Sequence, residues 1–425
     1  MQPESLQCAQ PKISVEFYMQ HKVAAAEGIR GIACFMVVFS HLSLSFFPYL
    51  HSFDQYHLTA YPLELAIHHS PFAFFYSGTA AVYIFFVLSG YVLSYAIMNS
   101  RNPLQKIQSM TIKRFPRLML PALGSCLLLW LAFHYLQPSG QYVSEWIDVL
   151  GEENPGPLSN AFFDGVVRTF WYGWSQYNWV LWTMKFELVG SLLVFALLYA
   201  RCKKITWYII LPLTLIASYL MLRMMPFHMN DLLQASWLDI LENNLEMLCF
   251  LLGMLCFFRF RRLGNFTAFG LLTFGLYCAG VHDNSPFYAW LNPWLDHRTY
   301  NLLNFMAGPL VVAAILMNEK LASLFSKRIP VYLGKISFAA YLNHLLLIYV
   351  LGLPLFNYLH HASHLSYAAN ALLTCAVVIA ATIILSELYY RLVDQKSIQL
   401  ANALAHLYFK ITISKRTRFY RTGRQ

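Results

Sequence analysis

The sequence predicts an all-α polytopic membrane protein with about ten transmembrane helices and both termini in the cytoplasm. Three observations support this prediction. Of the 425 residues, 58% are hydrophobic and only 12% are charged, whereas a soluble domain carries about 25% charged residues. Apolar runs of about 20 residues, the length that crosses a bilayer, recur along the chain. Lysine and arginine gather in clusters between these runs, as membrane topology signals do.

Ten apolar runs, separated by proline, glycine and charged residues, are the predicted spans. They cover residues 29–47, 76–98, 118–136, 180–200, 205–225, 243–258, 264–281, 300–318, 333–356 and 367–390. The segment before the first run is mostly polar and no small-residue cleavage site follows that run, so we expect a first helix rather than a signal peptide. The predicted parts are a cytoplasmic segment 1–28, a transmembrane domain 29–391 and a basic cytoplasmic tail 392–425.

The charges of the connections alternate along the chain. One set of connections holds basic clusters such as 101–117 and 259–262, and the other set holds acidic clusters such as 145–164 and 231–242. The positive-inside rule places the basic set in the cytoplasm, and ten spans with both termini inside satisfy every cluster. The net charge of +10 therefore reports topology, and the expected partner is the lipid bilayer rather than nucleic acid. For the basic tail we expect contact with anionic lipid headgroups.

The eight cysteines lie mostly in apolar runs and form no CxxC pair. They predict neither a disulfide framework nor a metal site, and no permanently bound cofactor is expected. The longest outer connection, from Gln137 to Val180, contains the turn-rich stretch GEENPGP and then the aromatic stretch FFDGVVRTFWYGWSQYNWV. Aromatic residues with glycine suit an interfacial or re-entrant segment.

Two ionisable residues sit on the first predicted helix, in the stretch EGIRGIACFMVVFSH. Arg30 and His41 are eleven positions apart, which places them within about 20° of each other on one helix face and about 16 Å apart along the axis. Ionisable residues inside a span are candidates for function. The alternative is an arginine that reaches lipid phosphate and a histidine that is hydrogen-bonded to a neighbouring helix.

Further polar residues occur in later spans. Glu187 needs a partner for its charge, and His41 could supply one as a base that the carboxylate orients; a structural ion pair is the alternative. His344 is either a second polar group of the same cavity or a packing histidine. Glu387 and Arg391 are spaced i, i+4, which favours an ion pair on the helix surface.

The stretch KRFPRLMLP places Arg114 and Arg117 three residues apart at the start of the third span. Residues three apart share a helix face, and two adjacent guanidiniums suit a phosphorylated ligand. Anchoring of the helix by positive charge at the cytoplasmic surface is the alternative.

Several stretches together resemble the acyltransferase family 3 membrane proteins. EGIRGIACFMVVFSH is similar to the opening motif of the family, with its Arg/Lys-x10-His spacing, and AVYIFFVLSGYVLS to its second helix. KRFPRLMLP carries the RxxR pair, and LWTMKFELVGS is similar to the Trp-Ser/Thr-x-x-x-Glu segment. LGKISFAAYLNHLLL and SELYYRLVDQ are similar to the last two motifs. The six stretches occur in family order between residues 27 and 397.

The resemblance implies transfer of an acyl group, most commonly acetyl, from cytoplasmic acetyl-CoA to a hydroxyl of a glycan outside the cell, by an enzyme of the plasma (inner) membrane. It implies His41 as catalytic base with Arg30 as its companion and Glu187 beside them. Donor-binding residues would be Arg114, Arg117 and Arg391. Substrate-binding residues would be Ser89, Trp182, Tyr341 and His344.

The sequence departs from the family pattern at three positions. Glu27, Thr183 and Asn343 stand where Asp, Ser and Trp are more common, which affects acceptor choice rather than chemistry. No serine or cysteine has a convincing base partner, so direct transfer is expected rather than an acyl-enzyme. Ten spans with ionisable residues near the midplane also describe a proton-coupled transporter or a glycan exporter, and a non-catalytic partner protein is a third alternative.

Overall fold

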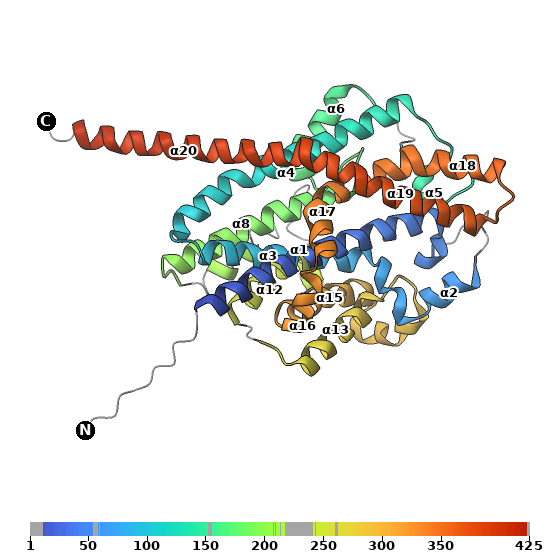
Figure 1. Cartoon of the computed structure of the whole chain (residues 1–425), viewed down its shortest axis with the longest axis horizontal. Helices are drawn as coiled ribbons and strands as arrows, with labels where there is room; N and C mark the ends of the chain where they lie inside the picture. The colour runs from blue at the N-terminus through green and yellow to red at the C-terminus, as the bar shows by residue number, and fades with distance from the viewer. Residues whose placement is uncertain are drawn as a thin grey trace.

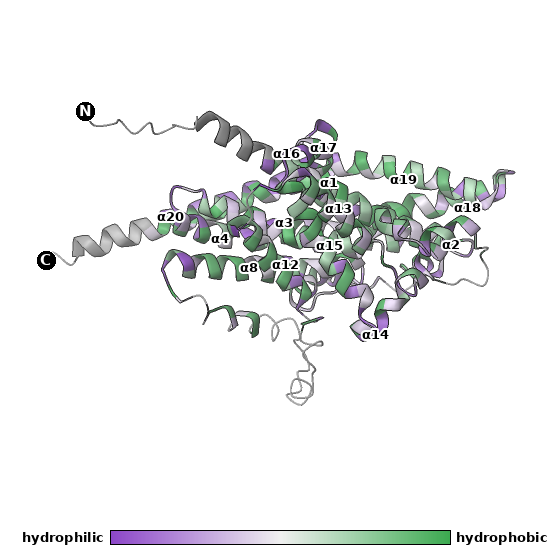
Figure 2. Ribbon diagram, turned by 90° about the horizontal axis from the view of Figure 1, so that it is seen from below, coloured by the Kyte–Doolittle hydropathy of each residue, from purple (hydrophilic) through white to green (hydrophobic). Residues whose placement is uncertain are grey.

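The computed structural model describes residues 12–422 except 54–57, 59, 152–154, 207, 209, 213, 217–240, 243 and 260–261, with side chains from residue 22 to residue 412. All regular elements in these described residues are helices, so the all-α prediction is confirmed. The long helices lie side by side in an elongated bundle (Figure 1). Hydrophobic residues run along their length, and hydrophilic residues are most evident at the connections (Figure 2).

Seven helical segments of the described chain are long and apolar enough to cross a membrane. They are Lys22–Phe46, Gly78–Met98, Pro103–Tyr135, Trp179–Cys202, Thr299–Leu316, Arg328–Ala362 and Tyr367–Thr412. They coincide with the first four and the last three predicted runs. The main helices in these segments are α1 (Lys12–Phe46), α3 (Gly78–Met98), α4 (Pro103–Tyr135), α8 (Trp182–Cys202), α15 (Thr299–Leu316), α17 (Arg328–Leu347) and α19 (Tyr367–Tyr389).

The structure therefore gives seven helices of spanning length among the described residues, and the predicted total of about ten stays a prediction. The sixth and seventh runs form α12 (Leu245–Arg259) and α13 (Asn265–Ala279), each of 15 residues. A helix of 15 residues is about 22 Å long, less than the ~30 Å of a hydrocarbon core. Most of the fifth run, 205–225, lies outside the described residues.

The helices alternate in direction between two ends of the bundle. The end at which α1, α4 and α17 begin is the terminal end, and the opposite end, with η1 (Pro48–His51) and α2 (Pro62–His68), is the loop end. Helix α1 packs against α17 and α3, and α3 packs against α12 and α15. These contacts put α1 at the centre of the bundle (Figure 1).

The chain after α19 stays helical through η7 (Tyr390–Asp394) into α20 (Gln395–Thr422). Helix α20 packs along α4, with Ser397, Ala401 and Ala405 buried. The segment predicted as a basic tail is thus an extension of the last span at the terminal end, where it projects beyond the other helices (Figure 1).

The connection between α4 and α8 folds back along α4. The second part of this connection, residues 155–181, is called the strap and contains α6 (Leu158–Phe163), η3 (Asp164–Arg168), α7 (Thr169–Trp171) and η4 (Trp179–Leu181). A Cβ built on Gly165 would lie 2.5 Å from the Leu123 Cα atom, so only glycine permits this approach. Leu123 is twelve residues, or about 18 Å, below the end of α4. The strap therefore descends well into the bundle, and α8 begins at depth.

Candidate active site

Helices α1 and α17 run in the same direction and touch through glycine. A Cβ on Gly31 would lie 2.5 Å from the Gly334 backbone nitrogen, and a Cβ on Gly334 would lie 2.0 Å from the Glu27 carbonyl oxygen. Small residues let two membrane helices approach this closely. Farther along, the Cys34 thiol lies 3.1 Å from the Ser337 carbonyl oxygen and donates to it. Both Gly31–Gly334 and Cys34–Ser337 differ by 303 in number, so the two helices are in register.

The same register brings two histidines together. His41 and His344 also differ by 303 positions, and the His41 Nδ1 atom lies 2.6 Å from the His344 Nε2 atom. The ring planes are within 8° of parallel, with centroids 4.9 Å apart, as an in-plane hydrogen bond requires. The second nitrogen of His344, Nδ1, lies 3.1 Å from the Ala340 carbonyl oxygen.

These contacts assign the tautomers of the two neutral rings. A carbonyl oxygen only accepts, so His344 Nδ1 carries a proton and His344 Nε2 is the acceptor. His41 Nδ1 must then carry the proton that lies between the rings. Of the four ring nitrogens, only His41 Nε2 then has a lone pair that is not used between the two histidines, so this atom is the base. A histidine held in one tautomer by a second group is the usual arrangement for general-base catalysis.

Trp146 of α5 (Glu145–Asp148) covers His41. Its ring centroid lies 5.2 Å from that of His41 with an angle of 23° between planes. Trp179 of the strap packs edge-on against Trp146, with centroids 5.6 Å apart. His344 is fully buried and His41 is partly exposed. The pair thus lies in an aromatic surround that limits the directions from which a substrate can reach His41.

A charged cavity of about 710 Å³ lies between α1, α3, α4, α8, α17 and the start of α20, on the side of the terminal end. Four cationic and three anionic side chains line it. They are Arg30, Arg114, Arg117 and Lys335, and Glu27, Glu187 and Asp394. The deeper lining is apolar or hydroxylic and includes Phe85, Phe86, Ser89, Thr183 and Tyr341. Charge at one end and an apolar interior suit a ligand with an anionic head and a slender neutral arm.

Two of the three arginines of this cavity, Arg30 and Arg114, form ion pairs with carboxylates. Arg30 Nη1 donates to both carboxylate oxygens of Glu27, at 2.9 and 3.1 Å. Arg114 Nη2 is paired with Glu187 Oε1, and Arg114 Nε donates to the Ser191 hydroxyl at 2.9 Å. These pairs keep the guanidiniums fixed and partly buried.

Glu187 does not pair with His41, and the alternative, a structural ion pair, is what the structure shows. Glu187 Oε1 accepts hydrogen bonds from Arg114 and from the Ser89 hydroxyl, the latter at 2.8 Å, whereas His41 is oriented by His344. The reason is depth. Because the strap carries the chain back into the bundle before α8 begins, Glu187 lies beside the guanidinium of α4 and away from the end of α1.

Tyr341 separates the charged cavity from the histidine pair. It lines the cavity, and its ring centroid lies 6.1 Å from that of His344 on one side and 6.1 Å from that of Phe85 on another. Its hydroxyl donates to the Val180 carbonyl oxygen at 2.9 Å and lies 2.9 Å from the Thr183 hydroxyl. Neither His41 nor His344 lines the charged cavity, and the Tyr341 ring lies between the cavity and His344.

The sequence matches the acyltransferase family 3 domain, described as an acyltransferase domain, over residues 23–387. The chain belongs to acyltransferase family 3. It is a multi-pass membrane acyltransferase, and the match contains both the histidine pair and most of the charged cavity. No curated protein and no solved structure matches the chain.

The structure of this acyltransferase divides the predicted site residues into three groups. Six of them line the charged cavity: Arg30, Ser89, Arg114, Arg117, Glu187 and Tyr341. His41 and His344 form the pair behind Tyr341. Arg30 and His41 lie on one continuous helix as expected, but Arg30 is about 16 Å from His41 along the axis and belongs to the cavity.

Two predicted residues lie outside both features. Trp182 is 37% exposed and packs edge-on against Phe186. Arg391 is on the surface, where its Nε atom donates to Glu387 Oε1 at 2.6 Å, so the ion pair favoured by the spacing is confirmed. Arg391 also follows the last residue of the family match.

Sequence reasoning missed polar residues at the loop end of the acyltransferase. His51, His68 and His282 have their rings near one another: His282 is 5.2 Å from His51 and 6.4 Å from His68 between centroids. The His51 Nε2 atom lies 2.8 Å from the Ser43 hydroxyl, two residues beyond His41. Burial lowers the pKa of His282 to about 4 and raises the pKa of nearby Glu64 to about 7. The repeated occurrence of histidine in the connections is the sequence signal that could have indicated this cluster.

Proposed function

We propose that this acyltransferase transfers an acetyl group from cytoplasmic acetyl-CoA to a hydroxyl of a glycan on the outer side of the plasma (inner) membrane. The observation that carries the proposal is the histidine pair, in which a fixed tautomer leaves a lone pair on His41 Nε2. In this proposal both chain termini are cytoplasmic and the charged cavity faces the cytoplasm.

The donor binds in the charged cavity. Guanidiniums form short, charge-assisted hydrogen bonds with phosphate oxygens, and Arg30, Arg114 and Arg117 all line the mouth or wall of this cavity. Arriving phosphates exchange with the carboxylates that pair with Arg30 and Arg114. The neutral pantetheine arm then extends along the apolar lining toward Tyr341, so that the thioester approaches the histidine pair from the cavity side.

The chemical step needs a base because an alcohol is a poor nucleophile near neutral pH. His41 Nε2 removes the hydroxyl proton as the oxygen attacks the thioester carbonyl carbon, which gives a tetrahedral intermediate. The carbon–sulfur bond then breaks, the CoA thiolate leaves, and the proton on His41 passes to the thiolate. The products are the acetyl ester and CoA thiol. The role of His344 is to hold the proton on His41 Nδ1 and to stabilise the imidazolium that forms.

Direct transfer is favoured over an acyl-enzyme. Within the described residues, neither imidazole forms a hydrogen bond with the side chain of a serine, threonine or cysteine. The nearby thiol of Cys34 is fully buried and donates to the Ser337 carbonyl oxygen. A covalent mechanism requires a nucleophile within hydrogen-bonding reach of its base.

The test uses membranes that contain the full chain, acetyl-CoA labelled in the acetyl group, and the envelope glycans of the source cells. Wild type is expected to move label into glycan, and His41→Ala is expected to abolish the transfer. His344→Gln is expected to lower kcat by about 10² to 10⁴-fold, the typical contribution of general-base catalysis. His134, an exposed histidine on α4, provides the control, since His134→Ala should keep full activity.

Two outcomes would refute the proposal. The first is movement of intact glycan across the membrane by wild type with no transfer of label, which would favour an exporter. The second is a fully active His41→Ala variant. The orientation has a separate test: a cysteine at exposed Gln141 should react with an impermeant thiol reagent added from outside the cell.

A further inference from the structure

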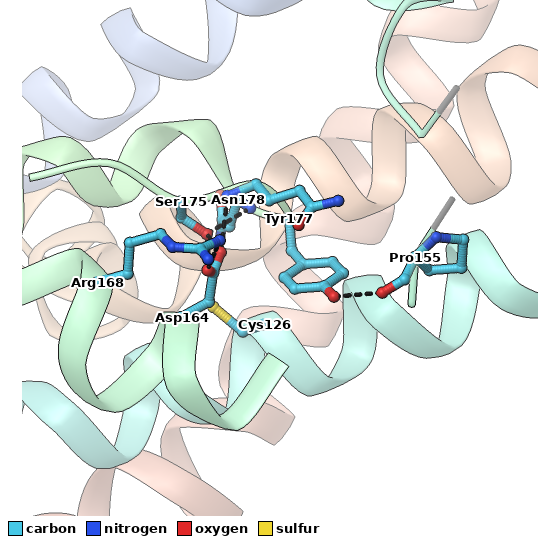
Figure 3. Close-up of polar contacts among 8 residues, drawn as sticks. Cys126, Pro155, Asp164, Arg168, Ser175, Tyr177 and Asn178 are labelled. Atoms are coloured by element: carbon cyan, nitrogen blue, oxygen red, sulfur yellow. Dashed lines mark hydrogen bonds and ion pairs between the residues drawn. The ribbon is translucent and has the colours of Figure 1, made fainter. Parts of the chain in front are cut away.

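The strap contains a fully buried carboxylate. Asp164 has no exposed surface, and its Oδ1 atom accepts a hydrogen bond from Arg168 Nη1 at 2.6 Å. Its Oδ2 atom accepts from the Ser175 hydroxyl and from the Gln176 backbone N–H, both at 2.7 Å. A buried charge is costly unless it is paired and hydrogen-bonded. These contacts, drawn in Figure 3, fix the fold of the strap just before Asn178.

Asn178 connects the strap to two helices. Its side-chain Nδ2 atom donates to the Ser125 hydroxyl of α4 at 3.0 Å and to the Leu342 carbonyl oxygen of α17 at 2.8 Å. Its backbone N–H donates to the Ser175 hydroxyl at 3.1 Å. The Leu342 carbonyl can only accept, so the amide nitrogen must face it and the amide cannot be flipped. Asn178 is fully buried, and both hydrogen bonds of its side-chain NH₂ group join the strap to another helix.

The two residues after Asn178 reach both sides of the histidine pair. Trp179 packs against Trp146, which covers His41. The Val180 carbonyl oxygen accepts from the Tyr341 hydroxyl, one helical turn before His344. Residues 178–180 therefore contact the surroundings of each histidine, on α5 and on α17.

We propose that Asn178 is a positioning residue for the His41–His344 pair, which it serves by locking the strap to α4 and by holding α17 through the Leu342 carbonyl. This inference deepens the proposed function and rests on it. Leu342 lies two residues before His344 on the same helix, so a rotation or shift of α17 at Leu342 moves the His344 ring. The 2.6 Å contact allows little displacement, because a hydrogen bond is lost beyond about 3.5 Å.

The decisive variant is Asn178→Leu, which keeps the branched shape of the side chain and removes its donors. Removing one partner of a buried hydrogen bond lowers the free energy of unfolding, but a role in stability alone predicts a normal kcat for the protein that stays folded. A positioning role predicts a kcat about 10 to 100-fold below wild type, since a misplacement of 1 Å can cost about 10²-fold. The KM for acetyl-CoA should stay within about twofold, because Asn178 does not line the charged cavity.

Asn343 supplies the matched control. It is 1% exposed and also lies near His344, but within the described residues its Nδ2 atom donates to the Ala339 carbonyl of its own helix alone, at 2.8 Å. Asn343→Leu therefore removes a buried amide without releasing the strap. It should leave the reactivity of a thiol beneath the strap at the wild-type value.

The reactivity of a native thiol reports, without catalysis, whether Asn178 holds the strap against α4; this attachment is called the lock. The Cys126 side chain is fully buried, and its sulfur lies 3.8 Å from the Ser175 hydroxyl beneath the strap. N-ethylmaleimide, applied to the full chain in lipid nanodiscs and followed by peptide mass spectrometry, should alkylate Cys126 slowly in wild type and in Asn343→Leu. The rate should rise at least tenfold in Asn178→Leu, because the strap is released.

The outcomes separate this inference from the proposed function. A wild type that transfers no acetyl group refutes the proposed function, while the Cys126 rate still tests the lock. An unchanged Cys126 rate in Asn178→Leu overturns the inference whatever the activity. It is also overturned if Asn178→Leu keeps the wild-type kcat, or raises the KM for acetyl-CoA instead.

Discussion

The close contact between α1 and α17 makes Gly334→Ala the most informative perturbation. The added Cβ atom would lie 2.0 Å from the Glu27 carbonyl oxygen, and real Cβ contacts under 3.0 Å essentially do not occur. The two helices must therefore separate by about 1 Å at this point. Transmitted along parallel helices, the same separation would stretch the His41–His344 contact from 2.6 Å to about 3.6 Å, where no hydrogen bond remains.

The expected result is a loss of about 10²-fold in acetyl transfer, with the protein still inserted in the membrane and monodisperse in detergent. Gly31→Ala should have a smaller effect, because its Cβ would lie 2.5 Å from the Gly334 nitrogen and demands about half the displacement. Gly270→Ala is the control, since nothing lies within 4 Å of its Cβ position. In initial-rate assays with labelled acetyl-CoA, Gly270→Ala should thus be the most active variant, Gly31→Ala intermediate and Gly334→Ala the least active. Full activity of Gly334→Ala would show that helix contact does not set the geometry of the pair.

Three other predictions concern charge and covering groups. Arg114→Ala should raise the KM for acetyl-CoA more than tenfold and lower stability by leaving Glu187 without its cation; adding Glu187→Gln should restore the melting temperature but not the KM. Trp146→Ala should lower kcat about tenfold because His41 loses its cover, whereas Trp182→Ala, on the surface, should not. Burial raises the pKa of Glu64 to about 7 from 4.5, so the folded state binds the proton more tightly than the unfolded state, and stability falls as pH rises from about 4.5 through 7. The free energy of unfolding of Glu64→Gln should equal that of wild type near pH 4 and exceed it at pH 8, by about 3 kcal/mol at most. Equal free energies of unfolding at pH 8 would contradict this reasoning.

The sequence was sufficient to predict the seven long helices and six of the residues that line the charged cavity. Apolar runs report the part of a helix that lipid covers, so seven runs coincide with spanning helices. They do not report where a helix ends in water, and this is why α4 begins at Pro103, well before the predicted 118. They also do not report how long a helix is, as α12 and α13, each of 15 residues, show.

The partners of the site residues could not be predicted from the sequence, because they depend on helix register and depth. His344 was recognised as a polar residue of the site, but its pairing with His41 follows from the glycine contact between α1 and α17. For Glu187 the sequence left His41 and an ion pair as alternatives, because the descent of the strap, and hence the depth at which α8 begins, is not visible in the pattern. Asn178 carries no signal in one sequence, since a buried asparagine in a connection resembles a turn residue.

The constant offset of 303 residues between the partners on α1 and α17 has a consequence for biogenesis. Ribosomes add about 5–20 residues per second, so His41 enters the bilayer about 15–60 s before the chain has supplied His344. During that interval the imidazole and the glycine face of the first helix have no permanent neighbour. Another protein or lipid must therefore cover this face of the first helix during insertion. In a chain that ends before Arg328, α17 is missing and His41 stays in the membrane without its partner.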